Sequence, residues 1–137
     1  MTSQLKVDKL QGRTTAGSIV VTSEGTSVET NLQQGLCKAW VNFDGTASGA
    51  TERDSFNISS TDDDGTGLFG VNFTNNMGNA TFSPTANRGV LTGGETTGGA
   101  NVNRLTTSSI DKLHSFSDDG SLSDRDMVLG QVFGDLA

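Results

Sequence analysis

The residues most capable of chemistry in this sequence lie in one acidic segment, STDDDGTGLFGVNF, from Ser60 to Phe73. Three consecutive carboxylates, Asp62, Asp63 and Asp64, precede two glycines. Oxygen ligands in a glycine-containing loop can hold calcium, and a glycine-rich loop can bind phosphate. Asp and Gly also form the tight turns that join neighbouring strands. The choice between these interpretations largely decides whether the chain does chemistry.

The spacing of the segment favours a turn. A helix-flanked calcium loop that starts at Asp62 needs a bidentate Glu at its twelfth position, which here is Phe73. A phosphate-binding loop needs Gly-Lys followed by Ser or Thr, and the segment has no Lys. We therefore predict a hairpin tip over Ser60–Gly67 that leads into a strand at Leu68–Phe73, and no metal site. An adventitious surface cation is the alternative.

No other set of residues predicts an enzyme. Cys37 and His114 are the single Cys and His of the chain, so they cannot build a zinc site or an intrachain disulfide. We expect Cys37 to be a small buried side chain and His114 an ordinary strand residue. No G-x-S-x-G motif occurs, and the Glu residues fall in turns without the converging pair that a glycosidase needs. We predict no catalytic residues and no cofactor.

The composition restricts the partners of the chain. The 137 residues carry a net charge of −7, and the nine Lys and Arg residues form no basic run. Binding to a phosphate backbone needs clustered positive charge, so we do not expect nucleic acid as a partner. The sequence contains no apolar run of about 18 residues and begins without an apolar signal region, so we expect neither membrane insertion nor a secretory signal.

From residue 36 the sequence follows the period-two alternation of β-strands. Phe69, Val71 and Phe73 should share one face of a strand, and Phe56 and Ile58 one face of another. We predict an all-β domain at residues 32–137, an antiparallel β-sandwich of jelly-roll or immunoglobulin-like form or a small barrel. The expected strands occupy residues 36–43, 53–60, 68–73, 79–85 (ended by Pro84), 88–94, 100–110, 111–117 and 127–134, with residues 93–99 as a long hairpin tip.

Residues 1–31 are predicted to form an extended N-terminal β arm with short strands at residues 5–11 and 18–23. Their apolar side chains are too few to close a core alone. The arm should therefore bury them against another chain or another part of an assembly, although it could instead add edge strands to the following domain. A helical turn at residues 30–36, ended by Gly35, should follow the arm. The assembly residues are Leu5, Val7, Leu10, Ile19 and Val21.

The segment LKVDKLQGRTTAGSIVVTSEG resembles the N-terminal segments of short appendage proteins of tailed phages, especially marine and cyanobacterial phages. GLCKAWVNFDGT, RDSFNISS, DDDGTGLFGVNFTNNMGNATFSPTA and QVFGDLA are similar to the β-rich domain of the same proteins. One departure is GTGLFGVNF, where members of the family often have GTGDYTVNF. The resemblance implies a homotrimeric, non-enzymatic structural protein of the virion, whose partners are other virion proteins.

Three hypotheses follow. The chain is a tail-fibre-like appendage that meets the host, a head decoration protein that stabilises the capsid, or a carbohydrate-binding or carbohydrate-active module. Host recognition, of a surface glycan or a protein, should reside in the polar loops at residues 44–52, 61–67, 93–99 and 118–126. The candidate contact residues are Asp62, Asp63, Asp64, Thr96, Asp118 and Asp119.

Overall fold

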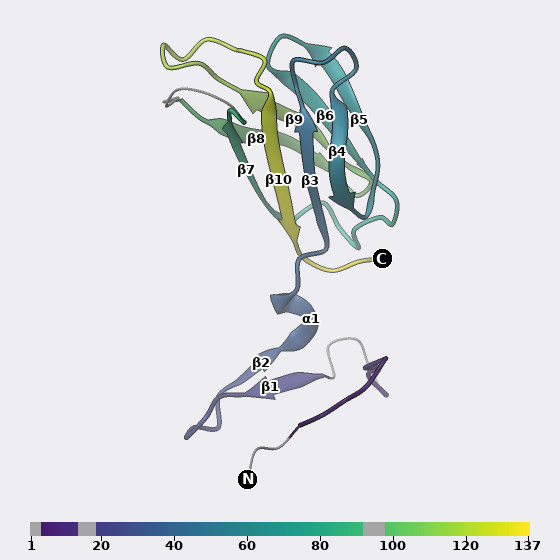
Figure 1. Ribbon diagram of the computed structural model, residues 1–137. Coiled ribbons are helices and arrows are strands. Elements are labelled where there is room, and N and C mark those ends of the chain that lie inside the picture. Colours follow the sequence, from purple (N-terminus) through teal and green to yellow (C-terminus); the bar gives the residue numbers. More distant parts are fainter. Residues whose placement is uncertain (1–3, 14–18, 92–97) are drawn as a thin grey trace. The chain divides into compact units, whose positions relative to one another are not determined.

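The computed structural model of the chain describes residues 4–13, 19–91 and 98–137 (Figure 1). Contacts divide it into two compact units, residues 1–36 and residues 37–137. The second unit is an antiparallel β-sandwich, as the alternation of apolar and polar residues predicted. The two units are described separately.

The first unit contains a two-stranded antiparallel sheet followed by one helical turn. β1 (Val20–Thr22) pairs with β2 (Glu29–Asn31), and α1 (Leu32–Gly35) follows directly. The Asn31 side chain caps α1 by accepting hydrogen bonds from two backbone amides of its first turn, at 2.8 and 3.2 Å. The predicted strand at residues 18–23 and helical turn ended by Gly35 are thus confirmed. The predicted strand at residues 5–11 is wrong, because no described segment pairs with it.

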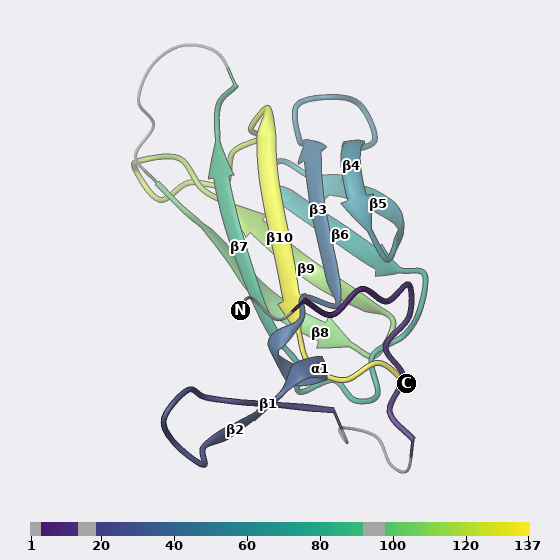
Figure 2. The same cartoon turned by 60° about the horizontal axis from the view of Figure 1, so that its bottom comes forward.

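The second unit consists of two four-stranded antiparallel sheets. Sheet I has the order β4-β3-β10-β7, and sheet II has the order β5-β6-β9-β8 (Figures 1 and 2). The strands of sheet I are β3 (Ala39–Asp44), β4 (Thr51–Phe56), β7 (Ser83–Gly89) and β10 (Met127–Phe133). Those of sheet II are β5 (Ile58–Gly65), β6 (Leu68–Phe73), β8 (Ala100–Thr106) and β9 (Ser109–Ser115).

The core lies between the two sheets and comes mainly from their central strands, with Ala50, Met77 and Phe82 added from connecting segments. Phe43 of β3 packs edge-on against Phe69 of β6, with ring centroids 5.1 Å apart. The predicted alternation in β6 is confirmed, because Phe69, Val71 and Phe73 are all buried. Burial of these side chains from water supplies the main force that holds the sheets together. The core comprises Ala39, Val41, Phe43, Ala50, Phe69, Val71, Phe73, Met77, Phe82, Ile110, Leu113, Val128 and Val132.

The segment expected as one strand at residues 53–60 is divided between the sheets at Asn57. Asn57 has a φ of +60°, a left-handed conformation that Asn tolerates better than most residues. Its side chain holds this corner by donating to the carbonyls of Lys38 and Asn75, at 3.0 and 3.1 Å. The prediction that Phe56 and Ile58 share a face is therefore wrong. Phe56 is 53% exposed on sheet I, whereas Ile58 packs against the core from sheet II.

Three further expectations are corrected. Pro84 lies inside β7 and does not end a strand, because β7 is an edge strand, where proline is tolerated. The strands before and after residues 93–99, β7 and β8, belong to different sheets, so they do not form the predicted hairpin. The hairpin between β5 and β6 turns only around Gly65–Gly67, so Asp62, Asp63 and Asp64 belong to β5 and not to the tip.

Candidate functional site

The described parts of all four predicted recognition loops gather at one end of the sandwich. β3, β5, β7 and β9 run toward this end, and β4, β6, β8 and β10 run away from it (Figures 1 and 2). We call this the loop end and define it as the described residues within 44–51, 65–67, 90–99 and 116–126. Residue 37, where the sandwich begins, lies at the opposite end, since β3 starts there and the Lys38 amide bonds to the Val132 carbonyl at 2.8 Å.

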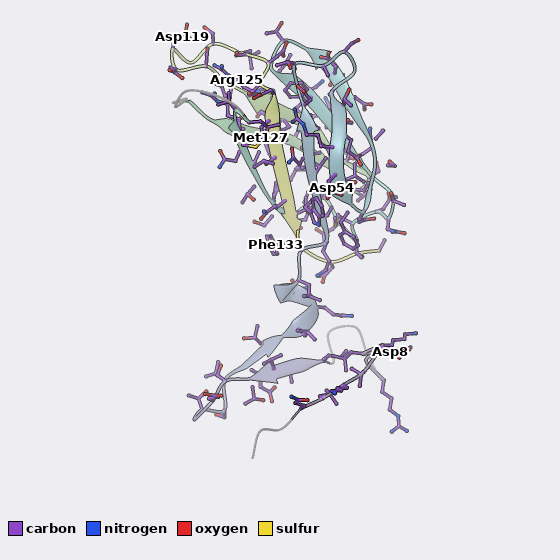
Figure 3. The ribbon with its side chains drawn as sticks, viewed as in Figure 1. Asp8, Asp54, Asp119, Arg125, Met127 and Phe133 are labelled. Atoms are coloured by element: carbon purple, nitrogen blue, oxygen red, sulfur yellow. The ribbon has the colours of Figure 1, made fainter. Side chains whose placement is uncertain are left out.

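The loop at residues 116–126, which includes Asp119 and Arg125 (Figure 3), contacts each of the other three loops. The Gly45 amide donates to the Arg125 carbonyl at 2.8 Å, and the Gly67 amide donates to the Asp124 carboxylate at 2.6 Å. The Leu91 amide donates to the Asp126 carboxylate at 3.2 Å. The Phe116 amide donates to the Gly99 carbonyl at 2.9 Å. One loop therefore fixes the arrangement of the whole loop end.

Asp118 and Asp119 lie in this loop but have different surroundings. Asp118 pairs with Arg88 at 3.3 Å, and the Arg88 side chain is almost fully buried while that of Asp118 stays 60% exposed. Asp119 shapes its own turn by accepting from the Ser117 hydroxyl at 2.6 Å and the Ser121 amide at 2.9 Å. These hydrogen bonds, the Ser117 hydroxyl first, hold the pKa of Asp119 below its usual value. Both side chains remain accessible to a partner.

Asp62, Asp63 and Asp64 each have a protein partner. Asp62 accepts from the Asn72 amide at 2.6 Å, Asp63 from the Gly65 backbone amide at 3.1 Å, and Asp64 pairs with Lys112 at 2.6 Å. The three carboxylates thus bind three separate groups. Within residues 4–13, 19–91 and 98–137, no group of three or more His, Cys, Asp or Glu side chains is placed to hold a metal ion.

Asp44 lies at the loop end, where β3 stops, and is not among the predicted contact residues. Its carboxylate accepts from the Thr46 hydroxyl at 2.6 Å and pairs with Arg53 at 2.7 Å. The Thr46 hydroxyl, its amide and the Arg53 charge together hold the pKa of Asp44 below 3.8. Arg53 also donates to the backbone carbonyl of Asp126. The two residues therefore connect β3 and β4 to the loop at residues 116–126.

Sequence reasoning missed the residues that organise the loop end. The hydrogen bonds that do so join residues at least 30 positions apart in the sequence, so no local sequence pattern predicts them. They are made by Asp124, Asp126 and Arg88. The turn around Asp119 does have a local signal, because Asp and Ser side chains commonly bond to backbone amides two residues away. Thr96, the remaining predicted contact residue, lies outside the described residues.

The predicted assembly residues of the first unit are largely accessible. The exposed fraction is 80% for Leu5, 56% for Val7, 55% for Leu10 and 53% for Val21. Ile19, just before β1, is partly buried. The arm thus presents apolar side chains that its own short sheet does not cover.

The two isolated reactive residues have ordinary surroundings. The Cys37 thiol is half-buried, not fully buried as predicted, and donates to the Ala39 carbonyl at 3.0 Å. The His114 ring packs edge-on against Phe116, with centroids 5.9 Å apart.

None of the described helices has the length and apolar character needed to cross a membrane. Comparison with known proteins found no matching family model, no matching curated protein and no matching solved structure.

Proposed function

We propose that this chain is a non-enzymatic structural protein of a tailed-phage virion, a homotrimeric tail-fibre-like appendage. Its N-terminal arm anchors it to other virion proteins, and its sandwich carries the loop end toward the host surface. The sequence resemblance suggests this class, and three features of the molecule support it.

The observation that carries the proposal is the concentration of exposed apolar side chains in the first unit. A two-stranded sheet is marginally stable alone in water, and the exposed side chains here are large. Burying them against neighbouring subunits or virion proteins would remove this apolar surface from water. Within residues 4–13 and 19–36, the exposed large hydrophobic residues are Leu5, Val7, Leu10, Val20, Val21, Val28 and Leu36.

The end at which the chain enters the sandwich fits the same role. The chain enters it at residue 37, at the end opposite to the loop end. A domain held by the segment before residue 37 would leave the loops at residues 44–51 and 116–126 free to meet another surface. The loops also carry accessible polar groups, such as Asp118 and Asp119, that suit adaptable hydrogen bonding.

Deletion of residues 1–31 tests the proposal. We expect the truncated protein to fold as a soluble sandwich, to lose its trimeric state in analytical ultracentrifugation, and to be absent from purified virions. A matched control, Asp119→Asn in the full-length chain, should still enter virions because it leaves the arm intact. Incorporation of the truncated protein into virions would overturn the proposed role of the arm.

The location of the labelled protein on the particle separates the two virion roles. An appendage should be labelled at the tail in electron micrographs. Labelling spread over the head would instead favour the alternative, a head decoration protein whose arm lies along the capsid. Such a protein would be present at a copy number close to that of the capsid subunits.

A further inference from the structure

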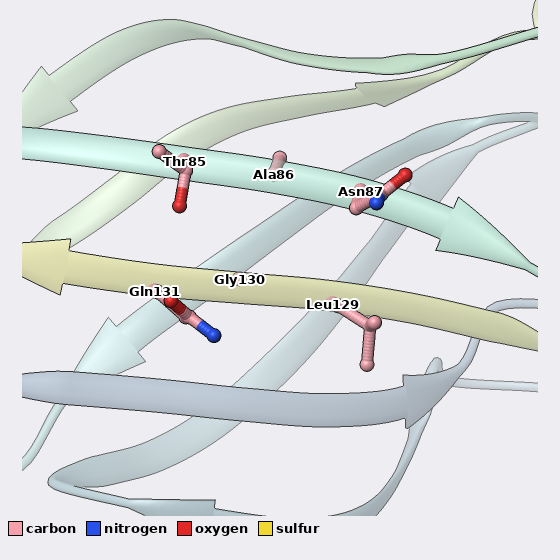
Figure 4. Close-up of a pocket in the computed structure, with 6 residues that line it drawn as sticks. All are labelled: Thr85, Ala86, Asn87, Leu129, Gly130 and Gln131. Carbon is pink, nitrogen blue, oxygen red and sulfur yellow. The ribbon is translucent and has the colours of Figure 1, made fainter.

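The outer face of sheet I carries a pocket that none of the interactions above uses. It has a volume of about 280 Å³ and opens between the neighbouring strands β7 and β10 (Figure 4). The side chains of Thr85, Asn87, Leu129 and Gln131 share the outer face around it, whereas Ala86 packs against the core and Gly130 lies opposite the buried Val41. The lining residues are Thr85, Ala86, Asn87, Leu129, Gly130 and Gln131.

The strand register places two aromatic side chains, Trp40 and Phe56, beside this pocket. Gln131 lies opposite Thr85 on one side and opposite Trp40 on the other, and Trp40 lies opposite Phe56. Opposite residues of antiparallel strands point to the same face, so these four side chains form one row. The row faces outward, because Val41 and Val132, adjacent to it in sequence, are buried in the core. Phe56 is 53% exposed, so its ring is available to a ligand.

The polar groups of the pocket are uncharged and available. Among the described residues, neither the Thr85 hydroxyl nor the Gln131 amide has a hydrogen-bond partner within the protein. The Asn87 side-chain oxygen accepts from the Arg88 backbone amide at 2.8 Å, which leaves its amide nitrogen free to donate. No lining residue carries a charge. The pocket thus offers both donors and acceptors to a neutral ligand.

We propose that this face binds a neutral saccharide, with sugar hydroxyls in the pocket and a pyranose ring stacked on Trp40. A sugar hydroxyl both donates and accepts, so it matches amide and hydroxyl side chains, and its apolar C–H face matches an aromatic ring. An anionic ligand would find no positive charge in the pocket and a chain with a net charge of −7. The same argument disfavours a nucleic acid, whose bases would also stack.

The inference rests on the proposed function only in that the sandwich meets a host surface. The binding test uses the purified full-length protein, so a negative binding result would leave the proposed incorporation into virions untouched. Incorporation could likewise fail while the saccharide still binds.

Trp40 is the only tryptophan of the chain, so its fluorescence reports on this face alone. The probes are the neutral polysaccharides dextran, mannan and galactan, with dextran sulfate as the charged counterpart of dextran. We expect at least one neutral polysaccharide to shift the emission of Trp40 saturably. Dextran sulfate should bind no better than dextran does.

Substitutions in the pocket locate the binding. Gln131→Ala and Thr85→Ala should each weaken binding by about tenfold, the effect of losing one or two hydrogen bonds to a ligand. Asn101→Ala is the matched control, because Asn101 is an exposed amide on β8 of the other sheet. Urea unfolding of each variant checks that the sandwich is intact. The control should bind as the unsubstituted protein does.

Three results would overturn the inference. The first is no response to any neutral polysaccharide, and the second is equal binding by Gln131→Ala and Asn101→Ala. The third is Trp40 emission that depends on protein concentration, together with a change of oligomeric state in Gln131→Ala. That result would show that a second copy of the chain covers the face instead.

Discussion

The backbone amide of Gly67 donates a 2.6 Å hydrogen bond to the carboxylate of Asp124, although 57 positions separate the two residues. This bond fastens the β5–β6 turn beneath the loop at residues 116–126. The fit is close, because a Cβ atom on Gly67 would lie 2.5 Å from both the Ser115 carbonyl oxygen and the Ser123 amide nitrogen. The loop end is thus a packed structure and not a set of independent loops.

Removal of the Asp124 carboxylate should loosen the loop end. We expect Asp124→Ala to lower the free energy of unfolding by about 1–2 kcal/mol, because the Gly67 amide loses a charged acceptor. Asp124→Asn keeps an acceptor and should cost less. Asp63→Ala is the control, since Asp63 bonds only to an amide two residues away. Urea titration measures the differences, and equal losses in Asp124→Ala and Asp63→Ala would contradict the prediction.

A comparison of Gly67 with Gly49, both of positive φ, separates the cost of backbone strain from the cost of close packing. Gly67 has a φ of +63° and no room for a Cβ, whereas Gly49 has a φ of +83° and open space around it. Gly67→Ala should cost about 2–4 kcal/mol and Gly49→Ala about 1 kcal/mol. Thermal unfolding monitored by circular dichroism compares them. A Gly49→Ala variant as unstable as Gly67→Ala would show that backbone strain alone sets the cost.

Phe69 should be much more important for stability than Phe56. Phe69 is fully buried against Phe43 of the opposite sheet, so Phe69→Ala should lower the free energy of unfolding by about 3–5 kcal/mol. Phe56 lies on the outer face, and Phe56→Ala should cost less than about 1 kcal/mol. Chemical denaturation tests the pair. Similar losses in the two variants would mean that the outer face of sheet I is covered by another subunit.

Asp44 should contribute to the pH dependence of stability. Its pKa is lower in the folded chain than the ordinary 3.8, mainly because the Thr46 hydroxyl bonds to the carboxylate. Its stabilising contribution is therefore complete well above pH 3.8 and is lost as the pH falls through the lower folded pKa.

We accordingly expect Asp44→Asn to be less stable than the unsubstituted protein at about pH 6, and the difference to shrink as the pH falls below 3.8. Urea titrations over this pH range measure the difference. High salt should reduce the part of the difference that comes from Arg53, because this pair is partly exposed. A difference that is independent of pH would assign the effect to hydrogen-bond geometry and not to charge.

The sequence alone predicted the features that depend on local pattern. Alternation placed Phe69, Val71 and Phe73 in the core, and Gly35 marked the end of the helical turn expected at residues 30–36. The sheet assignment of Phe56 and Ile58 was not predictable in this way. The direction of the chain at Asn57 depends on bonds to Lys38 and Asn75, each at least 18 positions away.

The sequence by itself determined an all-β domain with a thin core, because side-chain period and turn residues are local properties. Only the tertiary structure decided which strands form each sheet and that the separate loops meet at one end. It also decided that Trp40, Gln131 and Thr85 stand in one row. These relationships join residues distant in the chain, and antiparallel pairing sets their register.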